Sequence, residues 1–383
     1  MAVGPSAIEQ RFDPSKVKWT LLKENDPALD DKKRNIFCAY NHTGEMHMLE
    51  KPVPEPKAGE VLLHVRATGI CGSDLHFWKH GGIGDTKLAD ECGAGHESAG
   101  EIIALGEGVE GWKVGDRVAI EAGIPCGQAS CRFCLEGRYN QCQNMVFHSS
   151  PPFHGTLTRF IAHPAAWLHK LPDNVSFEEG SLVEPLSVAL AGLEAVDVKL
   201  GDPVLICGAG PIGLVTLLSA HAAGCYPIVI TDLVSNRLEF AKKLVPTVRT
   251  FQIERDAEPK ATADKIQELA GTPLKVALEC TGFESSITTA IYSLDSNGKV
   301  CVIGIGASTQ SYPFVWCSWK EIQLNFLFRY KHQYPKALRL IEGGLIDVKP
   351  LVSHRFALEK AVNAFHAAAN PAEGAIKVQI LDL

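Results

Sequence analysis

Hydrophobic and polar positions follow two different patterns in the first and second halves of the chain. Between about residues 36 and 185, short apolar runs such as IFCAY, VLLHVRATGI, SAGEIIALG and DRVAI are broken by Gly and Pro. This pattern predicts an irregular, β-rich domain. From about residue 200, apolar strand-like runs alternate with helical segments. Such alternation predicts an α/β domain built on a doubly wound parallel sheet.

The pattern after residue 200 predicts individual strands and helices. Strands are predicted at PVLIC, at YPIVITD, at 275–281 and at 299–304, and helices at PIGLVTLLSAHAAG, SNRLEFAKKL and ESSITTAIYSL. After Tyr330 come two more helical stretches, PKALRLIEGG and LEKAVNAFHAAA, and a last strand, AIKVQIL. Residues 1–35 are largely polar and are expected to form an N-terminal extension.

The length and net charge of the chain indicate how many domains it has and which kinds of partner are excluded. The chain of 383 residues is long enough for two domains. Its net charge of -7 argues against nucleic acid or an anionic membrane as the main partner. No apolar run is long enough to span a bilayer. The first residues have no apolar core typical of a secretory signal and carry acidic residues that a mitochondrial leader avoids, so a cytoplasmic location is expected.

A glycine motif follows the strand PVLIC. Gly208-x-Gly210-x-x-Gly213 leads into a helix with Pro211 near its start, and Asp232 ends the next strand, 24 residues after Gly208. These glycines permit a tight turn, the approach of a pyrophosphate and close helix–strand packing. The helix N-terminus favours phosphate, and Asp232 is placed to bind ribose hydroxyls and to repel a 2′-phosphate. A turn that binds nothing is the alternative. The context favours NAD.

Two further sets of residues suggest metal sites. Cys71 in TGICGSDLH, with His96 and Glu97 in GAGHESAG, offers a thiolate, an imidazole and a carboxylate. Three such ligands with one open position are typical of catalytic zinc, although ordinary buried or solvated roles are the alternative. The second set comprises four cysteines at metal-site spacing: Cys126, Cys131, Cys134 and Cys142. Four thiolates close a structural zinc site, and the acidic charge balance argues against a nucleic-acid-binding zinc finger.

Taken together, these motifs resemble the medium-chain zinc-dependent alcohol dehydrogenases over nearly all of the chain after residue 36. Within that family the resemblance is to the sorbitol, xylitol and L-arabinitol dehydrogenases. It rests on TGICGSDLHFWKHG, AGHESAGEI, GRYNQC, SPPFHGTLTRF, LPDNVSFEEGSLVEPLSVALAG, DPVLICGAGPIG, VITDLVSNRL, ALECTG and FRYKHQYPKALRL. The resemblance implies a β-rich GroES-like catalytic domain (36–187 and 331–383, with a zinc lobe at 123–143) and a Rossmann domain (188–330).

The resemblance also implies site residues. The catalytic zinc ligands correspond to Cys71, His96 and Glu97, and Glu184 stands where simple alcohol dehydrogenases have a further cysteine ligand. Glu184 is implied to hold a water or the substrate there. The positions that match the polyol pocket are Phe77, Phe147, Glu184, Arg329 and Tyr330. The positions that match dinucleotide contacts are Gly208, Gly210, Pro211, Ile212, Gly213, Asp232, Arg237, Ile303, Gly304, Ile305, Leu327, Phe328 and Arg329.

Two positions depart from the family pattern. Four residues separate Cys126 from Cys131, where two are usual, although all four ligands remain. Phe328 stands where the arabinitol branch usually carries Tyr, which favours sorbitol or xylitol as the substrate. For Phe77 a place in the core, and for Arg329 a surface ion pair, are the alternatives to a role in the pocket.

The expected activity is the oxidation of a polyol to a ketose. Zinc acts as a Lewis acid on a secondary hydroxyl, hydride passes to NAD, and Ser73 and Glu184 are candidates for carrying the proton out. The alternatives are a non-catalytic NAD-binding member of the superfamily, a dehydrogenase of smaller secondary alcohols and a zinc-free quinone reductase. One catalytic and one structural zinc are expected, and a homotetramer is implied by the resemblance.

Overall fold

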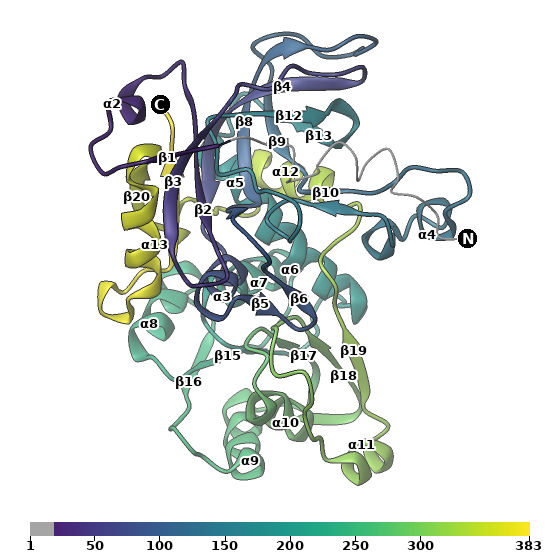
Figure 1. Ribbon diagram of the computed structural model, residues 1–383. Helices are drawn as coiled ribbons and strands as arrows, with labels where there is room; N and C mark the ends of the chain where they lie inside the picture. The colour runs from purple at the N-terminus through teal and green to yellow at the C-terminus, as the bar shows by residue number, and fades with distance from the viewer. Residues whose placement is uncertain (1–18) are drawn as a thin grey trace, which may run out of the picture. The chain divides into compact units, whose positions relative to one another are not determined.

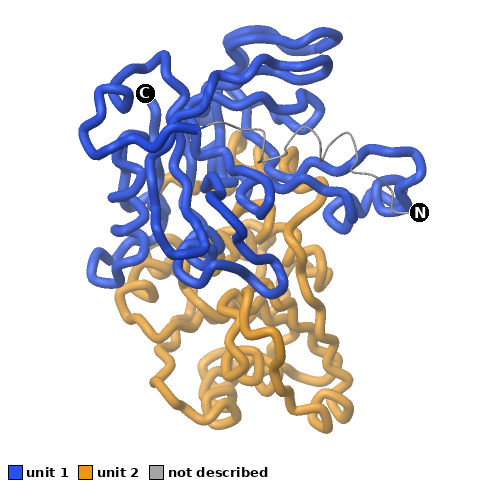
Figure 2. The backbone as a smooth tube through the Cα atoms, viewed as in Figure 1, with its two compact units in different colours: residues 1–184, 351–383 blue, residues 185–350 orange. Residues whose placement is uncertain are grey.

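The computed structural model describes residues 19–383 (Figure 1), so residues 1–18 of the expected extension lie outside the described part. The chain forms two compact units, shown in blue and orange in Figure 2. Unit 1 comprises residues 1–184 and 351–383, and unit 2 comprises residues 185–350. Their architectures match the predicted fold class, one being β-rich and the other α/β. Among the described residues, no helix has both the length and the apolar character needed to cross a membrane.

Unit 1 is built on a seven-stranded sheet whose last two strands come from the end of the sequence. Strand β4 lies between β8, which comes later in the N-terminal segment, and β21. The strands are β13 (Leu168–Lys170), β9 (Arg117–Ile120), β8 (Glu97–Leu105), β4 (Glu60–Gly69), β21 (Lys377–Leu381) and β20 (Val352–Ala357), with β12 (Phe160–Pro164) also paired to β4. Smaller pairs join β5 (Gly82–Ile83) to β6 (Thr86–Lys87) and β10 (Gly123–Ile124) to β11 (Val146–Phe147).

The first described residues belong to the fold. A four-stranded sheet has the order β1 (Thr20–Leu22), β3 (Met46–Lys51), β2 (Asn35–Tyr40), β7 (Cys92–Gly93). Leu22 and Leu29, the latter in α2 (Pro27–Asp30), are buried, and the Trp19 ring lies edge-on to Phe37. The expectation of an extension up to residue 35 is therefore wrong for residues 19–35. Their few apolar side chains are buried even though the segment is polar overall.

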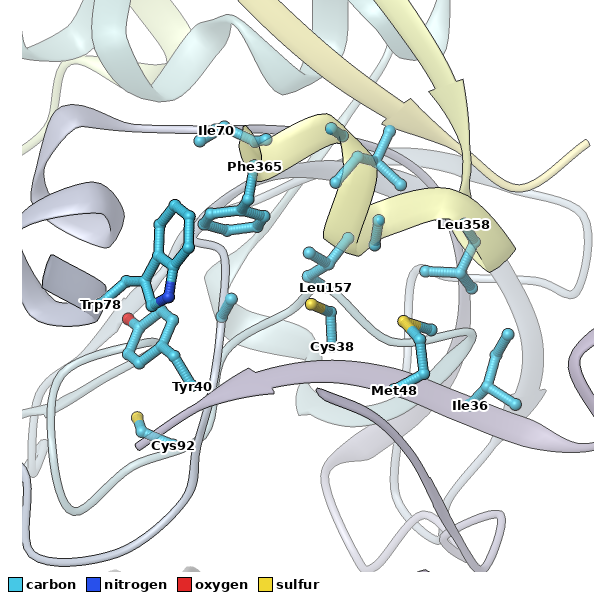
Figure 3. Close-up of a cluster of buried hydrophobic side chains, with 14 of the residues drawn as sticks. Ile36, Cys38, Tyr40, Met48, Ile70, Trp78, Cys92, Leu157, Leu358 and Phe365 are labelled. Carbon is cyan, nitrogen blue, oxygen red and sulfur yellow. The ribbon is translucent and has the colours of Figure 1, made fainter. Parts of the chain in front are cut away.

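The core of unit 1 joins its two ends. Tyr40 and Cys38 of β2 pack in one buried cluster with Trp78 of α3 (Gly72–His80) and Phe365 of α13 (Ala361–Ala369), as Figure 3 shows. The Trp78 and Phe365 rings meet edge to face, with centroids 6.1 Å apart. Burial of these large side chains attaches α3 firmly to the unit, which fixes the residues at the N-terminus of that helix.

Unit 2 has the predicted doubly wound sheet. Six parallel strands lie in the order β16 (Arg249–Gln252), β15 (Ile228–Asp232), β14 (Val204–Cys207), β17 (Leu274–Glu279), β18 (Leu294–Val302), β19 (Gln323–Phe326). The order reverses between β14 and β17. In such sheets, a ligand binds beyond the carboxyl ends of the strands at this switch point.

Helices connect these strands. They are α7 (Pro211–Ala222), α8 (Ser235–Leu244), α9 (Pro259–Ala270), α10 (Glu284–Ser293) and α11 (Phe314–Lys320), and a further helix, α12 (Tyr334–Glu342), follows the last strand, β19. Right-handed crossovers in a sheet of this order place α7 and α8 on one face and α9 and α10 on the other. The sequence pattern predicts α7, α8, α10 and α12 but not β16, α9, α11 or β19.

The boundary between the units differs from the expected one. Residues 331–383 were assigned to the catalytic domain, whereas unit 2 extends to residue 350 and includes α12. The Gln333 side chain, at the N-cap of α12, donates a hydrogen bond of 2.8 Å to Glu194 of α6 (Val183–Ala195), and Lys336 pairs with the same carboxylate. These contacts hold the start of α12 to the part of α6 that belongs to unit 2.

A buried arginine links distant segments of unit 1. Arg159 has no exposed surface and donates to Asp382 and Glu359, each at 2.8 Å, and to the backbone oxygens of Asp31 and Arg34. Burial alone would raise the pKa of Asp382, but hydrogen bonds from His64, Arg159 and Lys32 lower it strongly. Since the folded pKa is depressed, the stability that this carboxylate contributes is present above its ordinary value of 3.8 and is lost as the pH falls further.

Replacing Arg159 by methionine should lower the free energy of unfolding by about 3–5 kcal/mol, because Asp382 would remain buried without its main partner. Urea unfolding at pH 7 measures the change. Arg355→Met is the matched control: its bidentate pair with Glu178 is half-exposed, so a loss of about 0–1 kcal/mol is expected. Equal losses in the two variants would contradict the structural role assigned to Arg159.

Candidate active site

Three metal-binding side chains from separate segments meet in unit 1. Cys71 is the N-cap residue of α3, His96 lies in the turn before β8, and Glu97 is the first residue of β8. Their ligand atoms all lie within 4.8 Å of one another, and His96 and Glu97 are buried. Ligand atoms around one tetrahedral zinc are about 3.3–3.8 Å apart, because the bonds to zinc are about 2.0–2.3 Å long. The set therefore fits one ion after small side-chain adjustments.

Two glycines make room for this set. Gly69 of β4 lies opposite Glu97 in the sheet, and a Cβ atom there would lie 2.2 Å from Glu97 Oε2. Gly95 has a φ of +86°, and a Cβ atom there would lie 2.7 Å from Thr68 and 2.9 Å from Leu157. Any other residue at either position would displace a ligand or the turn that carries it.

Asp74 connects the three segments. It reaches back to the Cys71 backbone N–H (3.1 Å) and accepts hydrogen bonds from the Gly95 N–H (3.2 Å) and the Ser149 hydroxyl (2.8 Å). Its Oδ1 also lies 3.6 Å from His96 Nδ1. Burial would lower the pKa of His96, but Asp74 and Cys71 outweigh burial and raise it well above its ordinary value. A carboxylate this close gives a metal-binding histidine a partner of opposite charge.

Lys377 of β21 neutralises Glu97. Its ammonium group is buried and lies 2.8 Å and 2.6 Å from the two carboxylate oxygens, and it also donates to the Ile70 carbonyl at 3.0 Å. Burial would lower the pKa of Lys377, but Glu97 and Cys71 outweigh burial and raise it, and Glu184 adds to the effect. Glu97 is therefore held in place by a counter-charge from a strand far along the sequence.

The other predicted residues of unit 1 lie at different depths. The centroids of the Phe147 and His96 rings are 5.7 Å apart, and the role of Phe147 as an apolar wall of the site stays a prediction. Ser73 is in the first turn of α3, two residues after Cys71, and Glu184 is buried in the first turn of α6. Phe77 is only 5% exposed and stacks on Tyr40 in the core, which matches the alternative stated for it. Its role in binding substrate stays a prediction.

The four cysteines of the lobe form a second set. The sulfurs of Cys126 and Cys134 are 3.8 Å apart, those of Cys131 and Cys142 are 3.9 Å apart, and all four lie within 4.8 Å of one another. The sulfurs of a zinc tetrathiolate are expected about 3.8 Å apart, given bonds of about 2.3 Å. The longer spacing between Cys126 and Cys131 therefore does not keep the sulfurs apart, and the donor set fits one zinc.

In unit 2 the glycine turn has the predicted form. Gly208 has a φ of +95°, and Gly210 is the N-cap of α7, with Pro211 at the first helical position and Ile212 half-buried behind it. A Cβ atom on Gly213 would lie 1.9 Å from the Gly208 carbonyl oxygen, so only glycine fits there. The backbone N–H groups at the start of α7 are thus presented to a phosphate at the switch point of the sheet.

Asp232 ends β15 beside this turn. Its Oδ2 accepts from the Ala209 N–H at 2.7 Å, its Oδ1 accepts from the Val234 N–H at 2.8 Å, and Arg237 lies 3.8 Å from Oδ2. The side chain is 9% exposed. Asp232 therefore holds the glycine turn and retains lone pairs that ribose hydroxyls can use.

The remaining dinucleotide positions lie at the ends of β18 and β19. The Ile303 and Gly304 N–H groups donate to the Glu279 carbonyl, Ile305 is exposed, and the Leu327 N–H donates to Val302. A cavity of about 440 Å³ opens at this edge, bordered by Gly282, Gly304, Gly306 and Tyr312. Nearby, Arg329 has a φ of +57° and its guanidinium lies over Phe328, while Tyr330 is buried against Tyr334. The assignment of these residues to dinucleotide or polyol binding stays a prediction.

Three residues that position the sites were not predicted from the sequence. Asp74 could have been found, because a carboxylate three residues after an N-cap is typical of a capping box. Glu279, fully buried at the end of β17, accepts from Thr281, Gly282 and Ser286 and shapes the loop beside the cavity. No local signal marks Lys377, which meets Glu97 only through the pairing of β21 with β4.

Comparisons with known proteins agree with this geometry. Residues 57–173 match the alcohol dehydrogenase GroES-like domain, and residues 211–343 match the zinc-binding dehydrogenase family. L-arabinitol 4-dehydrogenase of Aureobasidium melanogenum is 52% identical over 84% of this chain and 87% of its own length. Sorbitol dehydrogenase of Mus musculus is 42% identical over 89% and 94%.

A solved structure is also similar. An Escherichia coli oxidoreductase of unknown specificity superposes with a TM-score of 0.84 at 34% identity, over 91% of this chain and 99% of that one. Both units, the site geometry and the sequence matches lead to the same assignment. The chain belongs to the medium-chain, zinc- and nicotinamide-dependent alcohol dehydrogenases, in the polyol branch that contains the L-arabinitol 4-dehydrogenases and the sorbitol dehydrogenases.

Proposed function

We propose that this enzyme oxidises one secondary hydroxyl of a five- or six-carbon polyol to a ketose, with NAD as hydride acceptor. The observation that carries the proposal is the convergence of Cys71, His96 and Glu97 on one point in a chain that also has a dinucleotide turn. The reaction converts the alcohol and NAD⁺ into ketone, NADH and one proton. One catalytic and one structural zinc per chain complete the proposal.

The cofactors supply the reactive chemistry: when bound, zinc lowers the pKa of the alcohol and NAD⁺ accepts the hydride. The chain positions and screens the reactants. Asp74 orients the His96 ring, Lys377 fixes the Glu97 carboxylate, and Phe147 provides an apolar wall. Ser73 and Glu184 are the groups we assign to proton removal, and Arg329 and Tyr330 those assigned to the other substrate hydroxyls.

Two observations bear on which polyol is used. Phe328, where the arabinitol branch usually carries Tyr, favours sorbitol or xylitol. The chain is nevertheless 50–52% identical to several L-arabinitol 4-dehydrogenases and 42% identical to sorbitol dehydrogenases. Sorbitol, xylitol and L-arabinitol therefore form the substrate panel.

The test is a spectrophotometric assay of NADH formation with this panel, 2-propanol and a quinone plus NADPH. Turnover of at least one polyol well above that of 2-propanol is expected. NADH formation only from 2-propanol would indicate a dehydrogenase of small alcohols, and quinone reduction alone would indicate a quinone reductase. Dinucleotide binding without any turnover would leave a non-catalytic member of the superfamily.

We also propose that the enzyme is a homotetramer, as the sequence resemblance implies, with small molecules rather than nucleic acid or a membrane as its partners. Light scattering that gives the monomer mass of 41.5 kDa would refute the tetramer. The cytoplasmic location stays a prediction.

A further inference from the structure

Helix α3 carries two histidines that the catalytic site does not use. Asp74, Phe77 and Trp78 form its buried side. His76 and His80 are exposed and follow one another by four residues, so they lie one turn apart on the same face. Their imidazole rings have centroids 4.8 Å apart and planes tilted by 54°.

This separation is compatible with two imidazoles bound to one metal ion. A nitrogen ligand lies about 2.0–2.1 Å from zinc, so the ring centroid lies roughly 3.2 Å from the ion. Two such centroids are then about 4.5 Å apart at a 90° ligand angle and about 5.2 Å apart at the tetrahedral angle. The observed 4.8 Å lies between these limits. Histidines four residues apart on a helix also provide the zinc ligands of metalloprotease helices.

Two further observations concern the charge of the pair and of the lysine next to it. Partial burial, and then the neighbouring His80, lower the pKa of His76, which favours the neutral ring that metal binding requires. Lys79, the cation between the two histidines in sequence, has its ammonium 3.5 Å from the Ala369 carbonyl and near the Trp78 ring. Its charge is therefore directed toward α13.

We propose that His76 and His80 form a third metal site, on the surface, which takes one transition-metal ion such as Zn²⁺ or Ni²⁺. Imidazole ligands suit these ions, and water completes the coordination. With two protein ligands instead of three or four, the site binds more weakly than the two sets described above. It fills and empties with the metal concentration while those sets keep their zinc.

The test uses the full-length, zinc-loaded protein dialysed free of excess metal and titrated with Ni²⁺ by calorimetry at pH 7.5. One exchangeable ion per chain is expected. Removing one ligand of a chelating pair should weaken binding about 100-fold, so His80→Gln and His76→Gln should both lose the transition. His366→Gln is the matched control, because His366 is exposed on α13 and lies against Trp78, with no histidine one turn away.

Zinc content and polyol turnover without added metal are measured in parallel. His80→Gln should keep both, since His80 belongs to neither zinc set nor to the proposed catalytic groups. Loss of Ni²⁺ binding in both variants, with binding retained in His366→Gln, supports the site. Wild-type protein that takes up no exchangeable Ni²⁺, or His80→Gln protein that binds Ni²⁺ as tightly as wild type, overturns it. Because the readout is metal binding, absence of polyol turnover would leave this result unaffected.

Discussion

Turnover should fall by about 1,000-fold or more when His96 is replaced by alanine. Lewis-acid polarisation of the substrate is worth several kcal/mol, and each 1.36 kcal/mol is a factor of ten in rate. Without His96, only Cys71 and Glu97 of this set remain, fewer than the three protein ligands typical of a catalytic zinc. Elemental analysis should therefore find one zinc per chain instead of two. NAD binding, followed by fluorescence titration, should be largely kept, because its predicted contacts lie in unit 2.

Two further variants provide a milder change and a control for this experiment. Asp74→Asn should weaken zinc binding or turnover about 10–100-fold, since it removes the charge that orients the ring but leaves all three ligands. His163→Gln is the matched control: His163 is fully buried, and within residues 19–383 its ring hydrogen-bonds His148 and the Trp167 carbonyl and none of the three ligands, so two zincs and normal turnover are expected. A His96→Ala protein that retains two zincs and more than a tenth of the activity would remove His96 from the metal site.

Cofactor choice should follow the charge at Asp232. A 2′-phosphate beside this carboxylate places like charges about 4 Å apart, which costs about 4 kcal/mol at an effective dielectric constant of about 20. Half of this energy still corresponds to a more than tenfold difference between the kcat/KM values for NAD and NADP. Arg237, 3.8 Å away, offsets part of the repulsion, so wild type should prefer NAD strongly without excluding NADP.

Changing Asp232 to serine and the exposed Leu233 to arginine should therefore shift the ratio of kcat/KM values at least tenfold toward NADP. Because Asp232 also accepts the Ala209 and Val234 N–H groups, the double variant should lose some activity with NAD as well. Leu233→Arg alone keeps the carboxylate and should shift the ratio little. Steady-state kinetics with both cofactors measure the effect, and a wild-type enzyme indifferent to the two would contradict the role given to Asp232.

The sequence predicted those features that depend on local pattern. Helix α8 was predicted with its observed bounds, because a polar-apolar helical repeat follows directly after the strand that ends at Asp232. The glycine turn and both metal sets were also predicted, since their residues cluster in short motifs. The edge strands β16 and β19 were missed: their side chains are half-buried or exposed, so neither forms an apolar run.

Features that depend on long-range contacts could not be predicted in this way. Residues 19–35 are polar on average, and only the pairing of β1 with β3 shows that Leu22 is buried. The boundary of unit 2 depends on Glu194 contacting Gln333, 139 residues later. The ion pair of Lys377 with Glu97 also depends on a long-range contact, because the order of the strands brings the two residues together and no sequence motif marks the pair.

The position of Lys377 also sets an order of events during synthesis. Its partner Glu97 precedes it by 280 residues, and the whole of unit 2 is translated between them. At about 5–20 residues per second, a ribosome needs roughly 15–60 s to cover that distance. During this interval unit 2 can fold as a contiguous segment. Glu97 has no cationic partner and β4 has no neighbouring β21, because Lys377 and β21 have not yet been synthesised. The carboxylate at the proposed metal site is therefore neutralised only after nearly all of the chain has been made.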